Sequence, residues 1–164
     1  MGRQYKTITE VFDFGPHISK VILHVGRSLK GAKLTENQFR VSVKRTAMSG
    51  EDFAWPVFMG EKPDDSMKGT RRITDLYVSD AEGCCVEDGE YITLCMYCDP
   101  REGLGSIIRF DGNFNVTVNT AYKIVQLAPI ETGADTLEGL VFDENGGNRL
   151  IYGELLQTAV HEDP

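Results

Sequence analysis

Four cysteines are the first residues in this chain whose type and number could support chemistry. Cys84 and Cys85 are adjacent, and Cys95 and Cys98 are three positions apart. Four thiolates are a common ligand set for structural zinc, but the paired ligands of such sites lie on tight turns. Cys95 and Cys98 fall within or at the end of a predicted strand, where residues three apart point to opposite faces. We therefore predict no metal and no cofactor, and interpret the cysteines as reduced structural thiols.

The histidines and serines form no recognisable catalytic pattern. His17 is next to a proline turn, His24 lies in a predicted strand, and His161 is close to the C-terminus. The sequence has no His-x-x-x-His motif, no Gly-x-Ser-x-Gly motif, and no phosphate-binding or dinucleotide-binding fingerprint. Because nothing places a nucleophile beside a general base, we predict that the chain is not an enzyme and has no catalytic residues.

A long loop from Ala47 to Thr70 is the strongest candidate for a functional site. Loops of this length are uncommon in compact domains and are usually functional or disordered. This loop carries four large apolar side chains that could form a contact site, namely Phe53, Trp55, Phe58 and Met59. Such side chains provide a large contact area when they are exposed. Three interpretations stay open: the side chains contact a protein or domain, stack on a sugar ring, or fold back over an open end of the fold.

The elements that must position these residues are predicted to be β-strands. Apolar side chains alternate with polar ones in several short segments, with a period of two. The clearest pair is Ile73–Ser79 and Glu90–Cys98, separated by a loop rich in Asp, Glu and Gly, and we interpret it as the centre of a β-sandwich core. The other predicted strands are Gln4–Phe14, His17–Val25, Phe39–Val43, Ser106–Phe110 and Phe114–Leu127. About seven antiparallel strands without an amphipathic helix indicate an all-β sandwich or barrel.

Composition and charge narrow the choice of partners. The chain has 164 residues, 41% of them hydrophobic, and a formal net charge of −8. This negative charge argues against a nucleic-acid partner, because phosphate binding needs clustered Lys and Arg. No apolar run is long enough for a membrane helix, and the N-terminal ten residues lack the apolar core of a signal peptide. We therefore expect a cytoplasmic protein, or a secreted one if a leader has been removed.

The charge distribution predicts a division of the chain at residue 126. Residues 1–126 carry 17 acidic and 16 basic side chains, whereas residues 127–164 carry 8 acidic and 1 basic. We predict a sandwich domain over 1–126 and an acidic C-terminal extension over 127–164. In the extension, Leu137–Phe142 and Arg149–Leu155 flank Asn145-Gly146-Gly147, which predicts a β-hairpin.

Several segments together resemble a known domain type. They are Thr9–Pro16, Ile18–Val25, Phe39–Val43, Arg72–Ser79, Gly89–Leu94 and Tyr122–Gln126. The sequence resembles the immunoglobulin-like domain that precedes the α/β-hydrolase domain in a family of bacterial esterases and predicted peptidases. The resemblance implies an immunoglobulin-like β-sandwich. It is specific for the domain type, because its motifs are structural.

The resemblance also implies a role. In that family the catalytic serine lies in the following domain, so no catalytic residue is carried over to this chain. It implies that Arg149-Leu150-Ile151-Tyr152 opens such a hydrolase domain. We therefore expect a non-catalytic accessory module that contacts a catalytic hydrolase domain or a second copy of the chain, with a homodimer as one form. The alternative is a carbohydrate-binding module that uses the Trp55 loop.

Overall fold

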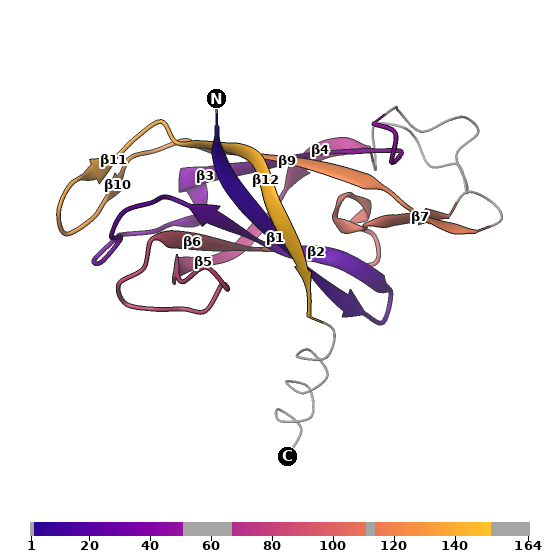
Figure 1. Ribbon diagram of the computed structural model, residues 1–164, viewed down its shortest axis with the longest axis horizontal. Coiled ribbons are helices and arrows are strands. Elements are labelled where there is room, and N and C mark those ends of the chain that lie inside the picture. Colours follow the sequence, from indigo (N-terminus) through magenta and orange to yellow (C-terminus); the bar gives the residue numbers. More distant parts are fainter. Residues whose placement is uncertain (1, 51–66, 111–113, 152–164) are drawn as a thin grey trace, which may run out of the picture.

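The computed structural model describes residues 2–50, 67–110 and 114–151, and these ranges are built almost entirely from β-strands (Figure 1). Two single 3₁₀ turns, Glu36–Gln38 and Gly103–Gly105, are the helical segments within them, and neither is long or apolar enough to cross a membrane. In chain order the strands are β1 Arg3–Phe12, β2 Gly15–His24, β3 Phe39–Thr46, β4 Lys68–Arg71, β5 Ile73–Ser79, β6 Tyr91–Met96, β7 Ile108–Phe110, β8 Asn115–Thr117, β9 Asn119–Gln126, β10 Ile130–Glu131, β11 Thr136–Leu137 and β12 Val141–Leu150.

Eight of these strands form one curled sheet in the order β4-β3-β9-β12-β1-β2-β6-β5. Its two halves, β1-β2-β6-β5 and β4-β3-β9-β12, correspond to the two layers of an immunoglobulin sandwich. Strands β12 and β1 are parallel and join the halves, whereas the other neighbours are antiparallel. The predicted all-β, immunoglobulin-like fold is confirmed.

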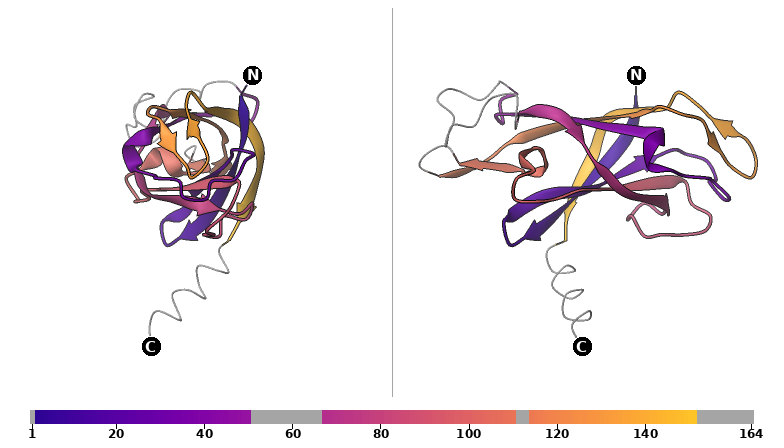
Figure 2. Two further views of the ribbon diagram at one scale, coloured as in Figure 1. Left: turned by 90° about the vertical axis from the view of Figure 1, so that its left-hand side faces the viewer. Right: turned by 180° about the vertical axis from the view of Figure 1, so that it is seen from behind.

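The chain crosses between the two halves at Arg72. Strands β4 and β5 are the two edge strands of the sheet, yet only this residue separates them in the sequence. The sheet must therefore curl until its two edges lie near each other, and the view along the molecule shows the resulting rounded cross-section (Figure 2).

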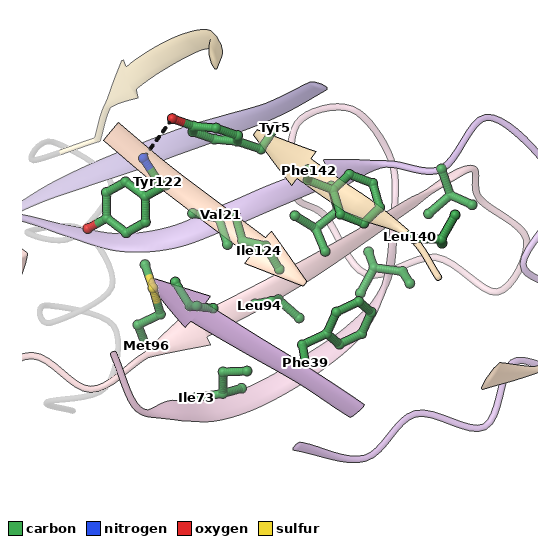
Figure 3. Close-up of a cluster of buried hydrophobic side chains, with 14 of the residues drawn as sticks. Tyr5, Val21, Phe39, Ile73, Leu94, Met96, Tyr122, Ile124, Leu140 and Phe142 are labelled. Carbon is green, nitrogen blue, oxygen red and sulfur yellow. Dashed lines mark hydrogen bonds between the residues drawn. The ribbon is translucent and has the colours of Figure 1, made fainter. Parts of the chain in front are cut away.

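The core follows from the alternation of side chains along the strands. In β3, Phe39, Val41 and Val43 point inward and are at most 4% exposed. Strands β2, β6 and β9 contribute further apolar side chains to the same core, several of which are drawn in Figure 3. Each fully buried side chain of this size stabilises the fold by about 1.5–3 kcal/mol.

All seven predicted strands are present, with four differences in detail. The pair β5–β6 is antiparallel as predicted, but β5 is an edge strand and the pair is not central. Strand β4 lies in a stretch predicted as loop, because its sequence, Lys-Gly-Thr-Arg, has no apolar alternation. The segment predicted as one last strand is divided into β8 and β9. Val116 is 37% exposed, and β8 pairs with β7 in a separate two-stranded ribbon.

The predicted C-terminal hairpin is wrong. Asn145, Gly146 and Gly147 lie inside one continuous strand, β12, which pairs with β1. The two glycines form a bulge opposite Lys6, and Gly147 adopts a φ of 135° that favours glycine. A Gly-Gly pair suits a bulge as well as a turn, and the ladder to β1 selects the bulge.

The segment after residue 126 belongs to the same fold in its described part. A small hairpin, β10–β11, is followed by β12, and Arg149 and Leu150 are the last residues of that strand. That a hydrolase domain opens at Arg149-Leu150-Ile151-Tyr152 stays a prediction. Ile130, Leu137, Leu140 and Phe142 are part of the common core. The division at residue 126 stays a prediction.

The hydroxyl of a tyrosine accepts a backbone hydrogen bond from β9 beyond the point where β12 stops pairing with that strand. These strands pair at Val141 and Phe142, and beyond this point the Tyr5 hydroxyl accepts a 3.0 Å hydrogen bond from the backbone N–H of Tyr122 (Figure 3).

We expect Tyr5→Phe to lower the free energy of unfolding by about 1–2 kcal/mol, because a buried N–H loses its acceptor. Urea denaturation measures this effect. Tyr91→Phe is the matched control and is expected to change stability by less than about 0.5 kcal/mol, and equal effects would contradict this role of Tyr5.

Candidate functional site

The predicted aromatic contact site lies outside the described residues. Phe53, Trp55, Phe58 and Met59 all fall within 51–66. The described residues on either side show that this segment connects the end of β3 to the start of β4. The contact with a protein or domain, the sugar-binding alternative and the covering of an open end therefore stay predictions.

A buried arginine makes several polar contacts between strands in the described part of the chain. Arg71 ends β4 and is 4% exposed. Its Nη1 donates to the carbonyl oxygen of Ile18 at 2.5 Å and to the Tyr122 hydroxyl at 2.9 Å. Its Nη2 donates to the carbonyl oxygen of Tyr97 at 2.8 Å and contacts the sulfur of Cys98 at 3.5 Å. The guanidinium therefore joins β4 to β2, to β9 and to the end of β6.

This arrangement is suited to holding strands together. Guanidinium groups stay protonated in proteins and cannot act as a base. Burial raises the pKa of Tyr122, so its hydroxyl stays neutral beside the positive charge. Burial also raises the pKa of Cys98, although Arg71 opposes this shift. Arg71 thus fixes the crossing from one half of the sheet to the other.

His17 packs against this arginine from β2. The ring is 4% exposed and contacts Phe14 edge-on, with 4.9 Å between ring centroids. A Cβ atom at Gly105 would lie 2.8 Å from the Arg71 guanidinium and 2.9 Å from the His17 ring, so a larger residue there would have to displace one of these buried groups. Neither ring nitrogen of His17 has a hydrogen-bond partner among the described residues. Burial, together with the charge of Arg71, lowers the pKa of His17.

We expect His17 to make the fold sensitive to mild acid. Below the unfolded-state pKa of about 6.5 the unfolded chain takes up a proton that the folded chain resists. Stability should fall as the pH decreases below that value, with a slope of up to about 1.4 kcal/mol per pH unit until the folded-state pKa is reached. Urea denaturation between pH 8 and pH 5 measures this slope. His17→Phe should flatten it, and an unchanged slope in the variant would exclude His17 as its cause.

Of the other two histidines, the structure describes His24. His24 stacks on Tyr91 at the surface, with 4.7 Å between ring centroids. His161 lies outside the described residues.

The cysteines divide into two pairs with different environments. Cys84 and Cys85 are exposed on the loop between β5 and β6, whereas Cys95 and Cys98 are partly buried. Cys95 and Cys98 both border one open groove of about 330 Å³, and β6 ends at Met96, between them. Burial raises the pKa of Cys95. Within the described ranges, no three or more His, Cys, Asp or Glu side chains are grouped so that they could hold a metal ion.

A second hollow lies beside the C-terminal strand. It has a volume of about 300 Å³ and is bordered by β1, β12 and the loop between β5 and β6. Ile8 and Ile22 line its floor, and the Arg149 guanidinium donates a 2.8 Å hydrogen bond to the carbonyl oxygen of Glu82 at its rim. Next to this hollow the side chains of β12 from Asp143 to Leu150 are exposed. This part of β12 is therefore a candidate contact surface.

The fold is that of an immunoglobulin-like β-sandwich domain. It has the strand order described above, β1 pairs in parallel with β12, and the core lies between the two halves of the sheet. The model of the family "Esterase Ig-like N-terminal domain" matches residues 4–139, and the chain belongs to this family. Among solved structures, the chain is similar to one described as "Crystal Structure of a Thermostable Esterase", with a TM-score of 0.68 and 22% sequence identity. The match covers 90% of this chain and 35% of the esterase chain, so this chain spans about a third of that protein. A search of curated proteins finds no match.

Sequence reasoning missed Arg71, Gly105 and the exposed half of β12. Arg71 stands in a short polar segment with no apolar alternation, so no pattern marked it as buried. The glycine pair in β12 was noticed, but its turn propensity pointed to a hairpin. The other strands were predicted from alternating apolar side chains, and neither β4 nor the exposed half of β12 has that alternation.

Proposed function

We propose that this chain is a non-catalytic accessory domain of an esterase-type α/β-hydrolase, which acts by contact with the catalytic domain or with a second copy of itself. The observation that carries the proposal is the match of residues 4–139 to the esterase Ig-like N-terminal domain family. In the structurally similar esterase, the region that this chain covers is also only 35% of the protein.

The chemistry of the described residues is consistent with a contact role. The buried polar groups Arg71, Tyr122 and Cys98 are bonded to one another or to backbone carbonyl oxygens. Bonds of this kind hold strands in place. The exposed part of β12 lies at the surface, where a neighbouring domain or chain could contact it (Figure 1).

A deletion experiment tests the proposal. The complete reading frame that contains this chain is expressed with and without residues 2–150, and esterase activity on a p-nitrophenyl ester, thermal stability and oligomeric state are compared. We expect hydrolysis to depend on the remainder of the protein, and the deletion to lower its thermal stability or change its assembly. A remainder that is unchanged in all three properties, or a reading frame that encodes no hydrolase domain, would contradict the proposal.

A further inference from the structure

The outward side of one half of the sheet is positively charged. Strands β4, β3 and β9 are neighbours in this half, and none of them contains Asp or Glu. The alternation that buries Val41 and Val43 turns Arg40 outward, and the strand registers put Lys68 and Lys123 on the same side. All three cations are exposed. We call the surface formed by Arg40, Lys68 and Lys123 the basic face.

The cations of the basic face are open to a partner. Among the described residues, the side chains of Arg40, Lys68 and Lys123 make no ion pair and no hydrogen bond. Lys44 lies on the same side of β3 but has an interaction of its own, so it is given no role in the contact. A surface with several charges of one sign attracts a surface of opposite sign. The basic face therefore fits an acidic partner.

An acidic counterpart is present on the same chain, in the loop between β5 and β6. Residues 80–90, which we call the acidic loop, include five acidic side chains and no Lys or Arg. The loop has a defined shape, since the Asp80 carboxylate accepts two backbone N–H groups within it at 2.9 and 3.0 Å. Three of its carboxylates are exposed and have no ion-pair partner within the described ranges, namely those of Glu82, Glu87 and Glu90.

The two surfaces lie on opposite sides of the molecule. Ile22 lies on the side of β2 that faces away from the core residues Val21 and Leu23, and the acidic loop packs on it, because a Cβ atom at Gly83 would lie 3.2 Å from the Ile22 side chain. The basic face is the outward side of the other half of the sheet, and β3, β4 and β9 lie above β5 and β6 in Figure 1. One copy therefore cannot bring its acidic loop to its own basic face.

We propose that the acidic loop of one copy of this chain docks on the basic face of a second copy. The proposal deepens the proposed function, since it names the surfaces by which a second copy is contacted. It does not require a hydrolase domain. Because each docked copy keeps one surface of each kind unused on its far side, the contact is head-to-tail and extends beyond a pair as the concentration rises.

The contact is weak. Its attraction comes from exposed ion pairs, each of which contributes little. Each chain also carries a net charge of −8, which opposes association at long range. We therefore expect a Kd of roughly 0.1–0.5 mM at about 0.15 M salt, where repulsion between distant charges is largely screened.

A mixing experiment tests the docking. Sedimentation of the 164-residue chain is measured from about 10 µM to about 1 mM for the native sequence and for two variants. The face-reversed variant carries Arg40→Glu and Lys123→Glu, and the loop-reversed variant carries Glu87→Lys and Glu90→Lys. Each variant alone places like charges on the two surfaces, and we expect its Kd to rise about tenfold or more. In an equimolar mixture the variants complement each other, and the Kd should return to within about threefold of the native value.

Two charge-matched controls separate docking from the effect of net charge. Lys33→Glu with Arg101→Glu has the net charge of the face-reversed variant, and Glu36→Lys with Glu131→Lys has that of the loop-reversed variant. These side chains are exposed and lie outside both surfaces, so each control should keep a Kd within about threefold of the native value. Thermal unfolding shows whether each variant is folded.

Three results would overturn the proposal. They are a native chain that stays monomeric over the whole range, reversed variants that associate as their charge-matched controls do, and a mixture that fails to restore association. A monomeric chain would still leave contact with a hydrolase domain intact, and only the deletion experiment decides that question.

Discussion

Replacing Arg71 with methionine is expected to lower the free energy of unfolding by about 2–4 kcal/mol. The substitution removes the guanidinium donor from the carbonyl oxygens of Ile18 and Tyr97 and from the hydroxyl of Tyr122. Each buried polar group left without a partner lowers the free energy of unfolding by about 1–3 kcal/mol. Removing the buried charge of Arg71 offsets part of this total loss. Urea denaturation at pH 8 measures the effect.

Two comparisons make the result specific for the guanidinium. Arg40→Met changes an exposed arginine on β3 and should alter stability by less than about 0.5 kcal/mol. Arg71→Lys keeps the positive charge but cannot reach all the acceptors from one compact ammonium group, so it should be intermediate. If Arg71→Met were no more destabilising than Arg40→Met, Arg71 would not be holding the two halves of the sheet together.

Phe142→Ala is expected to have the largest effect of any single substitution in the C-terminal part of the chain, about 3–5 kcal/mol. The ring is 0% exposed and belongs to the common core (Figure 3). Truncating a buried phenylalanine loses its transfer free energy and leaves a cavity. Denaturation by urea, followed by circular dichroism, provides the measurement.

The control for this prediction lies eight residues further along the same strand. Leu150 is 50% exposed, and Leu150→Ala should cost less than about 1 kcal/mol. A small effect of Phe142→Ala would mean that β12 is an appendage to the sandwich, as the division at residue 126 predicted from charge implies.

The sequence was informative wherever apolar side chains alternate along a strand. Phe39, Val41 and Val43 show this pattern, and they are buried on one face as expected. The same reasoning failed at β4, whose only buried side chain is the charged Arg71, because burial of an arginine depends on acceptors from distant strands. It also failed at β12, where an exposed polar strand is held by pairing with β1 and leaves no apolar signal.

The candidate site was less predictable than the fold. The aromatic side chains around Trp55 were identified by type alone, and they lie outside the described residues. Cys95 and Cys98 were expected on opposite faces, yet they border one groove because β6 ends between them. The open edge of β12 could not be found from local patterns, since it depends on where β9 diverges from its neighbour.

The most direct measurement for the central claim is an esterase assay on the purified 164-residue chain. Under the proposed function, these residues form a contact domain without hydrolase chemistry of its own. We therefore predict that hydrolysis of p-nitrophenyl acetate by the purified chain does not exceed the buffer rate at pH 8. Saturable hydrolysis that is lost when the chain is unfolded would contradict the account.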